Sequence, residues 1–554
     1  MIWILGVSII LILLYLLSTY KKKKRRKKTL DNLVSNWSKQ KNKDEFHFAS
    51  IEKYFKNNDQ KKDAFHIISD RCAVDLDINE TFKIIDRTSS KIGQQYLYFK
   101  LRSIENQDKL QDFNNLTLLF EENEDLRLKT QLILTNLNSN NSYSFEDLVT
   151  SQPIEKPKII WLIYTLSILS FFFVFLSFFF PIFFIFLIPI LATNMVFHYK
   201  NKWEVSNYID GVGQLSKALI VSKNLVAYSK IKNHFSDTSF IKEIEKISLK
   251  TAFISFEKKV DNEFAIAFWM ASEFIKVLFN FEYIIFYSFI ESITKRKEEL
   301  KKMFHFIGEI DAAISTASLK ASDYRLCQPK FVEEKGLIVK DIYHPLIKNY
   351  VANDLDLLDK SLLLTGSNMS GKTTFIRSVS INSVLAQTIN ICFAKNYTAP
   401  FFKLYSSIRI TDDILENTSY YLEEVLTIKE LVDASNSKNP CLFILDEIFK
   451  GTNTIERISG GKAILSYLNK GNNIVLVSTH DIELTDILSK ENFELFHFSE
   501  EIKNNKLTFD HKLKEGKLKT RNAIKILELY NYPTEIIEDA RKTEKITFGN
   551  TKQN

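Results

Sequence analysis

The segment Leu362 to Thr374, LLLTGSNMSGKTT, constrains the fold more than any other, because it joins an apolar strand pattern to a glycine loop and a helix start. The spacing of Gly366, four residues, then Gly371-Lys372-Thr373 is a complete P-loop pattern. Its glycines let backbone amides approach phosphate oxygens, and the following helix directs its positive dipole to the same place. The pattern predicts nucleotide binding, with Lys372 on the β- and γ-phosphates and Thr373 in a Mg²⁺ shell. The alternative is a chance match in a glycine-rich loop, but the chain has only 14 glycines.

A second apolar run, Cys441 to Leu445, ends in Asp446-Glu447 and predicts a buried strand with two carboxylates at its tip. Read as a Walker B motif, it assigns Mg²⁺ binding through water to Asp446 and the attacking water to Glu447. The alternative is an ordinary strand before a helix whose first turn prefers acids. A third strand, 473–477, leads to His480, which can sense or polarise the γ-phosphate.

Length and cysteine usage fit a large intracellular protein. The 554 residues allow three or four domains with ample buried core. The cysteines are too scattered for a zinc site or a disulfide framework, which is typical of a reducing compartment. They are Cys72, Cys327, Cys392 and Cys441.

The N-terminus combines an uncharged apolar stretch, 2–17, with a run from Lys21 to Lys28 in which every residue is basic. The basic run alone could be a nucleic-acid or nuclear-targeting patch. Its position directly after the apolar stretch favours a membrane helix with its positive flank inside. A cleaved signal peptide is a further alternative, although there the basic residues precede the apolar ones.

A second apolar stretch covers 159–197, which are 39 residues without Asp, Glu, Lys or Arg. A single helix of that length would extend about 58 Å, against about 30 Å for the hydrocarbon core, so two spans with a turn at Pro181 fit better. Lysines before and after the stretch place both its ends in the cytoplasm. With the N-terminal span, the chain has three predicted transmembrane helices, and its P-loop faces the compartment that holds ATP. The alternative is a buried pair of core helices.

The remaining pattern divides the chain near residue 330. Before it, 209–232 and 251–302 carry apolar residues at helical spacing, whereas from Leu337 onward short apolar strands alternate with helices, as in a mainly parallel sheet. We expect a transmembrane helix at 1–20, a basic juxtamembrane linker at 21–69, a helical core at 70–330 interrupted by the hairpin at 159–197, a nucleotide domain at 331–515 and a helical tail at 516–554.

The block from Tyr343 to His480 resembles the ATPase domain of the MutS mismatch-repair family. The resemblance is carried, in order, by YHPLIKNYVANDLDL, TGSNMSGKTTFIRS, SIRITDDILENTSYYLEE, LFILDEIFKGTNT and STHDIELT. FDHKLKEG and the segment from Asn522 are similar to the helical dimerisation element that closes MutS proteins. DLDINETFKIIDRTSSKIGQQYLYFKL and IGEIDAAISTASL resemble the ends of the family's helical core. The resemblance implies an α/β P-loop NTPase, the ABC-like ATPase domain of MutS, preceded by an all-α lever and core region, here with transmembrane helices.

The resemblance also implies roles for individual residues. Tyr350 would stack on adenine with Asn353 close by, Asn368 and Lys372 would contact phosphates, and Thr373 and Asp446 would hold Mg²⁺. The catalytic residues would be Glu447, His480 and Lys372. The rest of the ATP-binding set would comprise Gly366, Ser367, Met369, Ser370, Gly371 and Thr374, together with Thr418 and Ser419 from the other subunit. The family thereby implies a dimer, with the loop Gly451-Thr452-Asn453-Thr454 at the interface.

Two departures from the family pattern bear on function. Ser367 and Ser370 replace the usual Pro and Gly, and both keep the loop geometry feasible. Family members that read mismatches carry a Phe-x-Glu wedge on a separate domain ahead of the helical core, but only about 70 residues precede the core here. Phe120-Glu121-Glu122 and Phe331-Val332-Glu333 have the wedge's letters inside regions assigned elsewhere, so mismatch reading is unsupported.

The segment Ile458 to Lys462, ISGGK, looks like the signature loop of ABC transporters. That loop precedes the Walker B strand, whereas this segment follows it. A helix start with a serine cap is the simpler interpretation.

Two functions remain as hypotheses. The first is a membrane-anchored MutS-type protein that binds and hydrolyses ATP with Mg²⁺ and binds DNA through a dimeric, ATP-driven clamp cycle. The second is a membrane-tethered ATPase that acts on membrane or protein partners without mismatch recognition. Both predict a homodimer in the cytoplasmic membrane with its ATPase domain in the cytoplasm, bound to the lipid bilayer and, in the second case, to an unknown protein partner.

Overall fold

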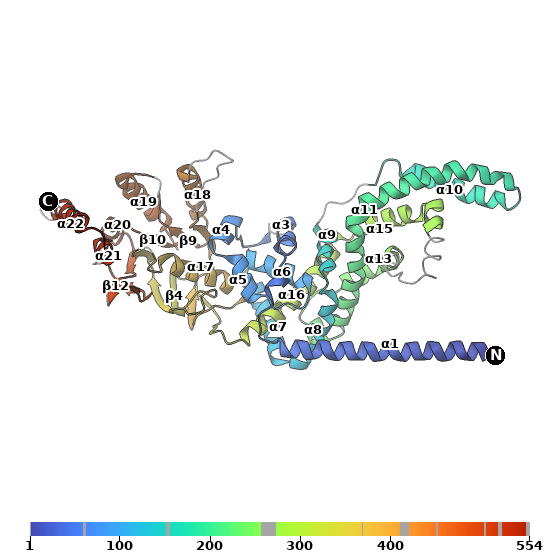
Figure 1. Ribbon diagram of the computed structural model, residues 1–554, viewed down its shortest axis with the longest axis horizontal. Helices are drawn as coiled ribbons and strands as arrows, with labels where there is room; N and C mark the ends of the chain where they lie inside the picture. The colour runs from blue at the N-terminus through green and yellow to red at the C-terminus, as the bar shows by residue number, and fades with distance from the viewer. Residues whose placement is uncertain are drawn as a thin grey trace. The chain divides into compact units, whose positions relative to one another are not determined.

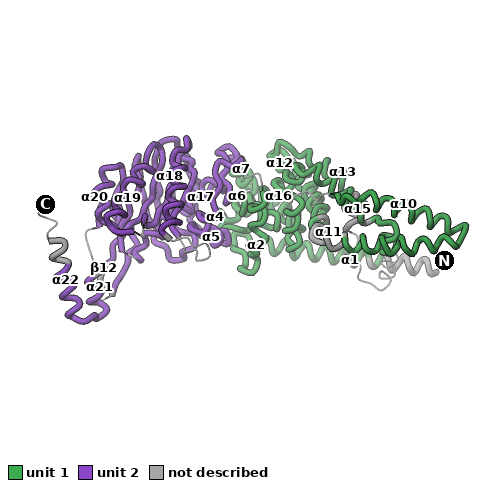
Figure 2. Tube along the Cα trace, turned by 90° about the horizontal axis from the view of Figure 1, so that it is seen from above, with its two compact units in different colours: residues 1–62, 85–100, 112–322 green, residues 63–84, 101–111, 323–554 purple. Residues whose placement is uncertain are grey.

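The computed structural model divides into two compact units, which Figure 2 shows in different colours. Unit 1 comprises Met1–Lys62, Ile85–Lys100 and Asp112–Ser322, and unit 2 comprises Asp63–Ile84, Leu101–Gln111 and Asp323–Asn554. The structure describes residues 2–58, 63–150, 156–255, 273–367, 369–409, 420–449, 452–503, 506–518 and 523–549.

Unit 1 is built from helices. Its C-terminal helix α16, Lys297–Lys320, presents a nearly continuous buried surface from Phe306 to Leu319. The other main helices are α1 (Ile2–Ser35), α6 (Lys91–Arg102), α7 (Gln107–Glu122), α8 (Glu124–Leu134), α9 (Phe145–Thr150), α10 (Ile160–Ser177), α11 (Phe184–Val226), α13 (Phe240–Ser255) and α15 (Phe281–Thr294).

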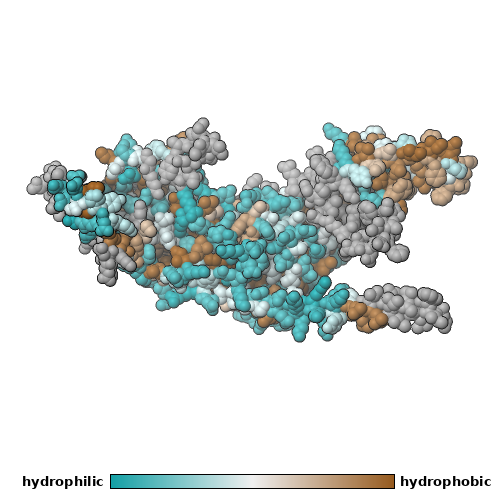
Figure 3. All heavy atoms as spheres, in the orientation of Figure 1, coloured by the Kyte–Doolittle hydropathy of each residue, from teal (hydrophilic) through white to brown (hydrophobic). Residues whose placement is uncertain are grey.

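The apolar stretch at 159–197 forms a helical hairpin in which α10 packs against the first part of α11 (Figure 1). A short 3-10 turn, Pro181–Phe183, joins the two helices at the predicted proline. Ile160–Ser177 and Pro181–Lys200 are the two candidate spans among the described residues, and only 22% and 17% of these windows are buried. Figure 3 shows the apolar surface gathered over this hairpin. The predicted N-terminal span lies in α1, where the side chains of 1–11 and 14 are outside the described residues.

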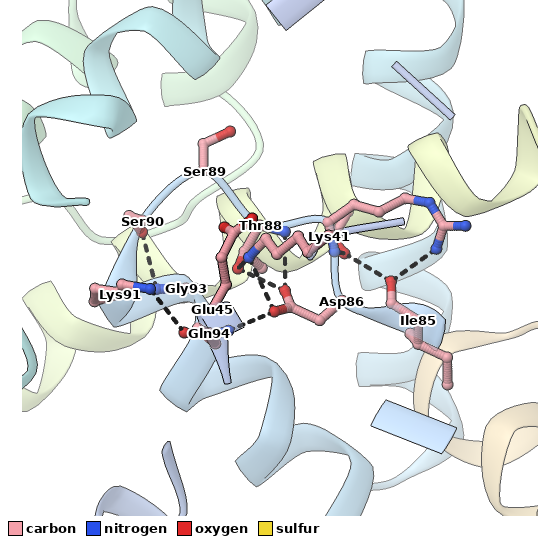
Figure 4. A network of polar contacts seen from close by, with 12 residues as sticks. Lys41, Glu45, Ile85, Asp86, Thr88, Ser89, Ser90, Lys91, Gly93 and Gln94 are labelled. Carbon is pink, nitrogen blue, oxygen red and sulfur yellow. Dashed lines mark hydrogen bonds and ion pairs between the residues drawn. The ribbon is translucent and has the colours of Figure 1, made fainter. Parts of the chain in front are cut away.

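The predicted juxtamembrane linker at 21–69 is largely structured. Helix α1 continues through the basic run to Ser35, and Lys41 then donates to Asp86 Oδ2 and Thr88 Oγ1, both at 2.9 Å. Asp86 also accepts from the side-chain amide Nε2 of Gln94 at 2.7 Å, so one carboxylate ties the linker to helix α6 (Figure 4). The side chain of Asp86 is fully buried, and hydrogen bonds therefore compensate its lost hydration.

Unit 2 contains a six-stranded sheet in the order β14-β11-β6-β10-β9-β8. Strands β8 to β11 and β6 pair in parallel, and the central strands β6, β9 and β10 are buried almost throughout, as apolar runs covered on both faces should be. The strands are β6 (Ser361–Thr365), β8 (Lys403–Ser407), β9 (Cys441–Asp446), β10 (Ile474–Thr479), β11 (Phe493–His497) and β14 (Lys514–Glu515).

Helices and smaller sheets complete unit 2. A four-stranded sheet has the order β3-β7-β4-β5, and a hairpin pairs β12 with β13. These strands are β3 (Lys330–Phe331), β4 (Gly336–Ile342), β5 (Asn353–Leu358), β7 (Asn396–Ala399), β12 (Glu500–Lys503) and β13 (Lys506–Phe509). The helices are α17 (Lys372–Ile389), α18 (Tyr420–Ser435), α19 (Thr454–Leu468), α20 (Glu483–Leu488), α21 (Ala523–Leu529) and α22 (Thr534–Gly549), the last two lying in the predicted helical tail.

The division into units differs from the single boundary predicted near residue 330. Residues 63–84, with strand β1 (His66–Ile67) and helices α4 (Asp70–Asp75) and α5 (Ile78–Ile85), group with the sheet of unit 2 instead of the helical core. The reason is direct bonding: His66 Nε2 lies 2.7 Å from Leu404 O, and the buried Asp75 accepts from Ser406 Oγ at 2.7 Å and from Arg409 N at 2.8 Å. The mixed α/β architecture is confirmed. The helical core is discontinuous in the sequence, because residues 63–84 and 101–111 belong to unit 2.

Candidate functional site

The P-loop segment joins the carboxyl end of β6 to the start of α17. Gly366 and Gly371 have φ of +152° and +116°, and a Cβ on Gly366 would lie 2.8 Å from Ser370 Oγ and 2.9 Å from Phe498 O. Only glycine therefore fits at Gly366. Lys372 is 5% exposed and donates to Gly366 O at 2.7 Å and Ser367 O at 3.0 Å, so its ammonium group lies inside the curve of the loop.

Two neighbouring parallel strands bring a carboxylate, Asp446 of β9, and a hydroxyl, Ser478 of β10, to the same edge of the sheet. Thr373 Oγ1 donates to Asp446 Oδ2 at 2.8 Å, and Ser478 donates to the other oxygen of the same carboxylate. The Thr373 hydroxyl at the start of α17 and the Asp446 carboxylate at the end of β9 are oxygen ligands of the kind that Mg²⁺ takes when phosphates complete its shell. These donors fit a Mg²⁺ ion bound together with a nucleotide.

Glu447 follows Asp446 in a left-handed conformation, with φ of +59°. Its backbone N–H donates to Ser478 O at 2.9 Å, which fixes the turn after β9 to the end of β10. The side chain reaches His480, with Oε1 3.0 Å from Nε2, and the same His480 nitrogen lies 3.3 Å from Lys372 Nζ. Non-glycine residues with positive φ are strained and gather at functional sites. The structure thus brings together all three residues predicted as catalytic.

A cavity of about 330 Å³ opens beside these residues, and all its lining residues belong to unit 2. The predicted residues that line it are Tyr350, Asn353, Ser367, Met369, Gly371, Lys372, Thr373, Thr374 and Glu447. Tyr350 stacks on Tyr343 with ring centroids 3.7 Å apart, so a purine could meet only its other face. Asn353 has a different use: its amide donates to Val351 O and His511 O and accepts from Leu513 N, which anchors the loop after β13.

Four predicted residues cannot be placed. Asn368, Thr418, Ser419 and Gly451 lie outside the described residues. Of the rest of the predicted interface loop, Asn453 caps helix α19 by accepting from Glu456 N at 3.0 Å.

The structure adds residues that sequence reasoning missed. His511 lines the cavity, and its Nδ1 lies 2.9 Å from Ser370 O. Ser367 donates to Glu500 Oε2, at 2.5 Å, so the β12–β13 hairpin is attached to the P-loop at both its ends. The only sequence signal for His511 was its place in the segment FDHKLKEG. Nothing in the sequence distinguished Glu500 from the other acidic residues.

A buried histidine, His344, also lines the cavity. His344 is 5% exposed, and burial lowers its pKa to about 4, which outweighs the opposite effect of Asp77. Its Nδ1 accepts from Leu346 N at 3.3 Å. His344 is therefore neutral. Among the described residues that line the cavity, the buried cationic side chain is that of Lys372.

Fold and site together define a mixed α/β protein with a glycine loop, a lysine and paired carboxylates at the carboxyl ends of parallel strands. Comparison with known proteins shows which family the C-terminal part of the chain resembles. A family model described as MutS domain V matches residues 362–547. Residues 362–547 are thus similar to MutS domain V, in agreement with the resemblance carried by the ordered motifs.

Curated relatives match about half of the chain. DNA mismatch repair protein MutS of Listeria welshimeri serovar 6b is 32% identical over 292 residues, covering 49% of this chain and 34% of the relative. The proteins of the same name from Staphylococcus carnosus and Aquifex pyrophilus are 31% and 30% identical, covering 47% and 48% of this chain and 31% and 32% of the relatives. The chain therefore spans about a third of the length of these relatives.

Proposed function

We propose that this protein is a Mg²⁺-dependent ATPase of the MutS type. The observation that carries the proposal is the convergence of Lys372, Thr373, Asp446, Glu447 and His480 around one glycine loop. Bound Mg²⁺ would neutralise phosphate charge, with Thr373 and Asp446 supplying its protein oxygens.

The chain's own groups have distinct tasks in this proposal. Lys372 exchanges its loop carbonyls for phosphate oxygens, and the backbone amides of the loop hold the phosphates at the start of α17. Glu447 orients the attacking water and receives its proton. His480 positions the Glu447 carboxylate and senses the γ-phosphate, because its Nε2 atom lies near both Glu447 and Lys372.

The test uses the purified full-length chain in detergent. We expect it to retain ATP and to release phosphate only when Mg²⁺ is present, with activity lost on chelation and restored by added Mg²⁺. Protein that neither retains nor cleaves Mg·ATP would overturn the proposal.

The same proposal includes attachment to the cytoplasmic membrane, with the ATPase domain in the cytoplasm. Support comes from the hairpin, where Phe178 is 82% exposed and Ile188 67% exposed, a surface unlike the buried core pair considered as the alternative. The N-terminal apolar stretch would add the third span. Alkaline washing of isolated membranes should leave the protein in the pellet. Release into the wash, or digestion of the C-terminal half by protease added to intact cells, would contradict this attachment.

DNA is the first candidate for what the ATPase acts on, because the matched relatives are named DNA mismatch repair proteins. A homodimer is part of this candidate. Support comes from two exposed apolar side chains, Met369 in the P-loop at 82% and Ile455 in the first turn of α19, next to the predicted interface loop, at 79%. Binding to duplex, mismatched and branched DNA should weaken steeply as salt rises, since phosphate contacts release counterions. Affinity no greater than that of a charge-matched control protein would favour the alternative, an ATPase acting on a membrane or protein partner.

A further inference from the structure

Residues 273–294 form two helical limbs that break at Asn280. Asn280 has φ of +50° and is 1% exposed, between helical residues 273–279 and helix α15. The break frees backbone carbonyls, and polar side chains of the hairpin cap them. Asn194 Nδ2 donates to Leu278 O at 2.9 Å, and Ser167 Oγ donates to Phe279 O at 2.8 Å.

The break lies near the middle of the hairpin's height. Phe279 stacks on Phe171 of α10, with ring centroids 4.0 Å apart. Phe171 lies eleven residues beyond Ile160, where α10 begins, which corresponds to a rise of roughly 16 Å at ~1.5 Å per residue. That height is about half of a hydrocarbon core of ~30 Å.

Both limbs lead from this apex toward the same end of the hairpin. On one side Glu291 of α15 pairs with Lys156, just before α10 begins. The ten residues from Phe281 to Glu291 rise roughly 15 Å, which matches the height of Phe171. On the other side Glu273 Oε1 lies 3.1 Å from His198 Nε2, one helical turn beyond Asn194 toward the basic flank at Lys200.

We infer that residues 273–294 are a re-entrant element that enters the same leaflet of the bilayer as the base of the hairpin and returns to the side from which it came. This inference rests on the proposed membrane attachment. Its ligand is the lipid hydrocarbon, which would contact Phe274 and Ile275, 54% and 48% exposed on the outer face of the first limb.

Two physical observations favour this arrangement over a soluble helical pair. Irregular backbone at membrane depth is tolerated only where protein groups satisfy its carbonyls. Here the carbonyl oxygens of Leu278 and Phe279 each accept a hydrogen bond from a side chain of the hairpin. Asn194 and Ser167 are buried polar residues of a largely apolar hairpin, where such residues are costly unless they bond within the protein. The apex gives each of them a partner. Because both limbs end on the same side, the element does not cross the bilayer. The predicted topology, with the ATPase domain in the cytoplasm, therefore stays the same.

Nitroxide labels on the full-length chain in phosphatidylcholine–phosphatidylglycerol vesicles test the inference. Labels are placed by Ile275→Cys in the first limb, Ile185→Cys in the hairpin and Leu358→Cys in unit 2, where the replaced side chains are 48%, 62% and 63% exposed. Cys72, Cys392 and Cys441 are buried, and the signal of the parent chain, including Cys327, is subtracted. Oxygen and a water-soluble nickel chelate then report lipid and water access.

We expect the label at position 275 to resemble that at 185, with oxygen favoured, and the label at 358 to favour nickel. A water-like label at 275 beside a lipid-like label at 185 would overturn the re-entrant element and leave membrane attachment standing. Water-like labels at both positions would remove the attachment and the inference with it.

A second variant tests the caps. Asn194→Leu removes the donor to Leu278 O, whereas Thr193→Leu changes the polarity of an exposed neighbour that bonds only within its own helix, to Pro189 O. We expect Asn194→Leu to raise the fraction of water-exposed label at 275 by roughly fivefold, and Thr193→Leu to leave it unchanged. Equal behaviour of the two variants would show that the apex does not depend on this cap.

Discussion

Asp77, at the start of α5, forms an ion pair with Arg377 on the P-loop helix, with Oδ2 3.2 Å from Nη1. The other oxygen of the same carboxylate lies 2.9 Å from Arg409, the last described residue after β8. One acidic side chain from residues 63–84 thus holds two segments that flank the nucleotide site. Arg377 stands one helical turn after Thr373 and is close enough to Asp446 for their charges to interact.

Asp77→Asn should therefore weaken Mg²⁺ use more than ATP binding. Without its partner, the half-buried Arg377 is free to interact with Asp446, and lost charged hydrogen bonds typically cost about 1–3 kcal/mol. We expect the Mg²⁺ concentration for half-maximal ATPase activity to rise by roughly tenfold. Asp433→Asn, which breaks an exposed pair with Lys429, is the matched control and should leave this concentration unchanged. An unchanged Mg²⁺ requirement in Asp77→Asn would assign Asp77 a purely structural role.

Glu447→Gln should separate ATP binding from hydrolysis. The amide keeps the shape of the side chain but cannot take a proton from water, so turnover should fall roughly tenfold or more while ATP affinity stays near that of the wild type. Lys372→Ala should instead lower ATP affinity, because it removes the buried ammonium group of the loop. Single-turnover hydrolysis and equilibrium binding of labelled ATP distinguish the two effects. Wild-type turnover in Glu447→Gln would assign the base to another residue.

Gly366→Ala should abolish ATP binding through local geometry. Its methyl group would meet Ser370 Oγ at 2.8 Å and the backbone oxygen of Phe498 at 2.9 Å, and φ of +152° is unfavourable for alanine. Gly471→Ala is the matched control, since Gly471 also has positive φ, +63°, but has nothing within 4 Å of the added methyl. Calorimetric titration with Mg·ATP should show binding in the control alone. A comparable loss of ATP binding in both variants would assign the effect to backbone strain at any positive φ, and not to the steric clash within the P-loop.

Local patterns in the sequence predicted the strands, the P-loop and the hairpin, because each depends on residues close together in the chain. Two features depended on distant contacts and were not predicted. Asp75 bonds to Ser406, more than 300 residues away, and draws residues 63–84 into unit 2. The break at Asn280 lies inside a stretch, 251–302, whose apolar spacing fits a continuous helix equally well. His511 was missed because it lies in a loop without periodicity.

Asp311 should make the stability of unit 1 depend on pH. It is fully buried on α16 and accepts from Ser89 N at 2.8 Å and from Ser90 N at 2.7 Å, at the start of α6. Burial raises its pKa from 3.8 to about 6. The native state therefore binds more protons than the unfolded state between these values, so this group's contribution to stability falls as pH rises from about 4 to about 6.

Comparison with Asp311→Asn isolates this effect, because the amide does not titrate. Relative to the variant, the wild type should lose up to roughly 3 kcal/mol of stability between pH 4 and pH 7, whatever the difference at neutral pH. Hydrogen exchange of the amides in α6 and α16, measured for both proteins at each pH, reports the change locally. Asp433→Asn, at an exposed position, should give a constant difference from the wild type. A wild-type advantage over Asp311→Asn that grows with pH would reverse the sign and show that the hydrogen bonds from Ser89 and Ser90 outweigh burial.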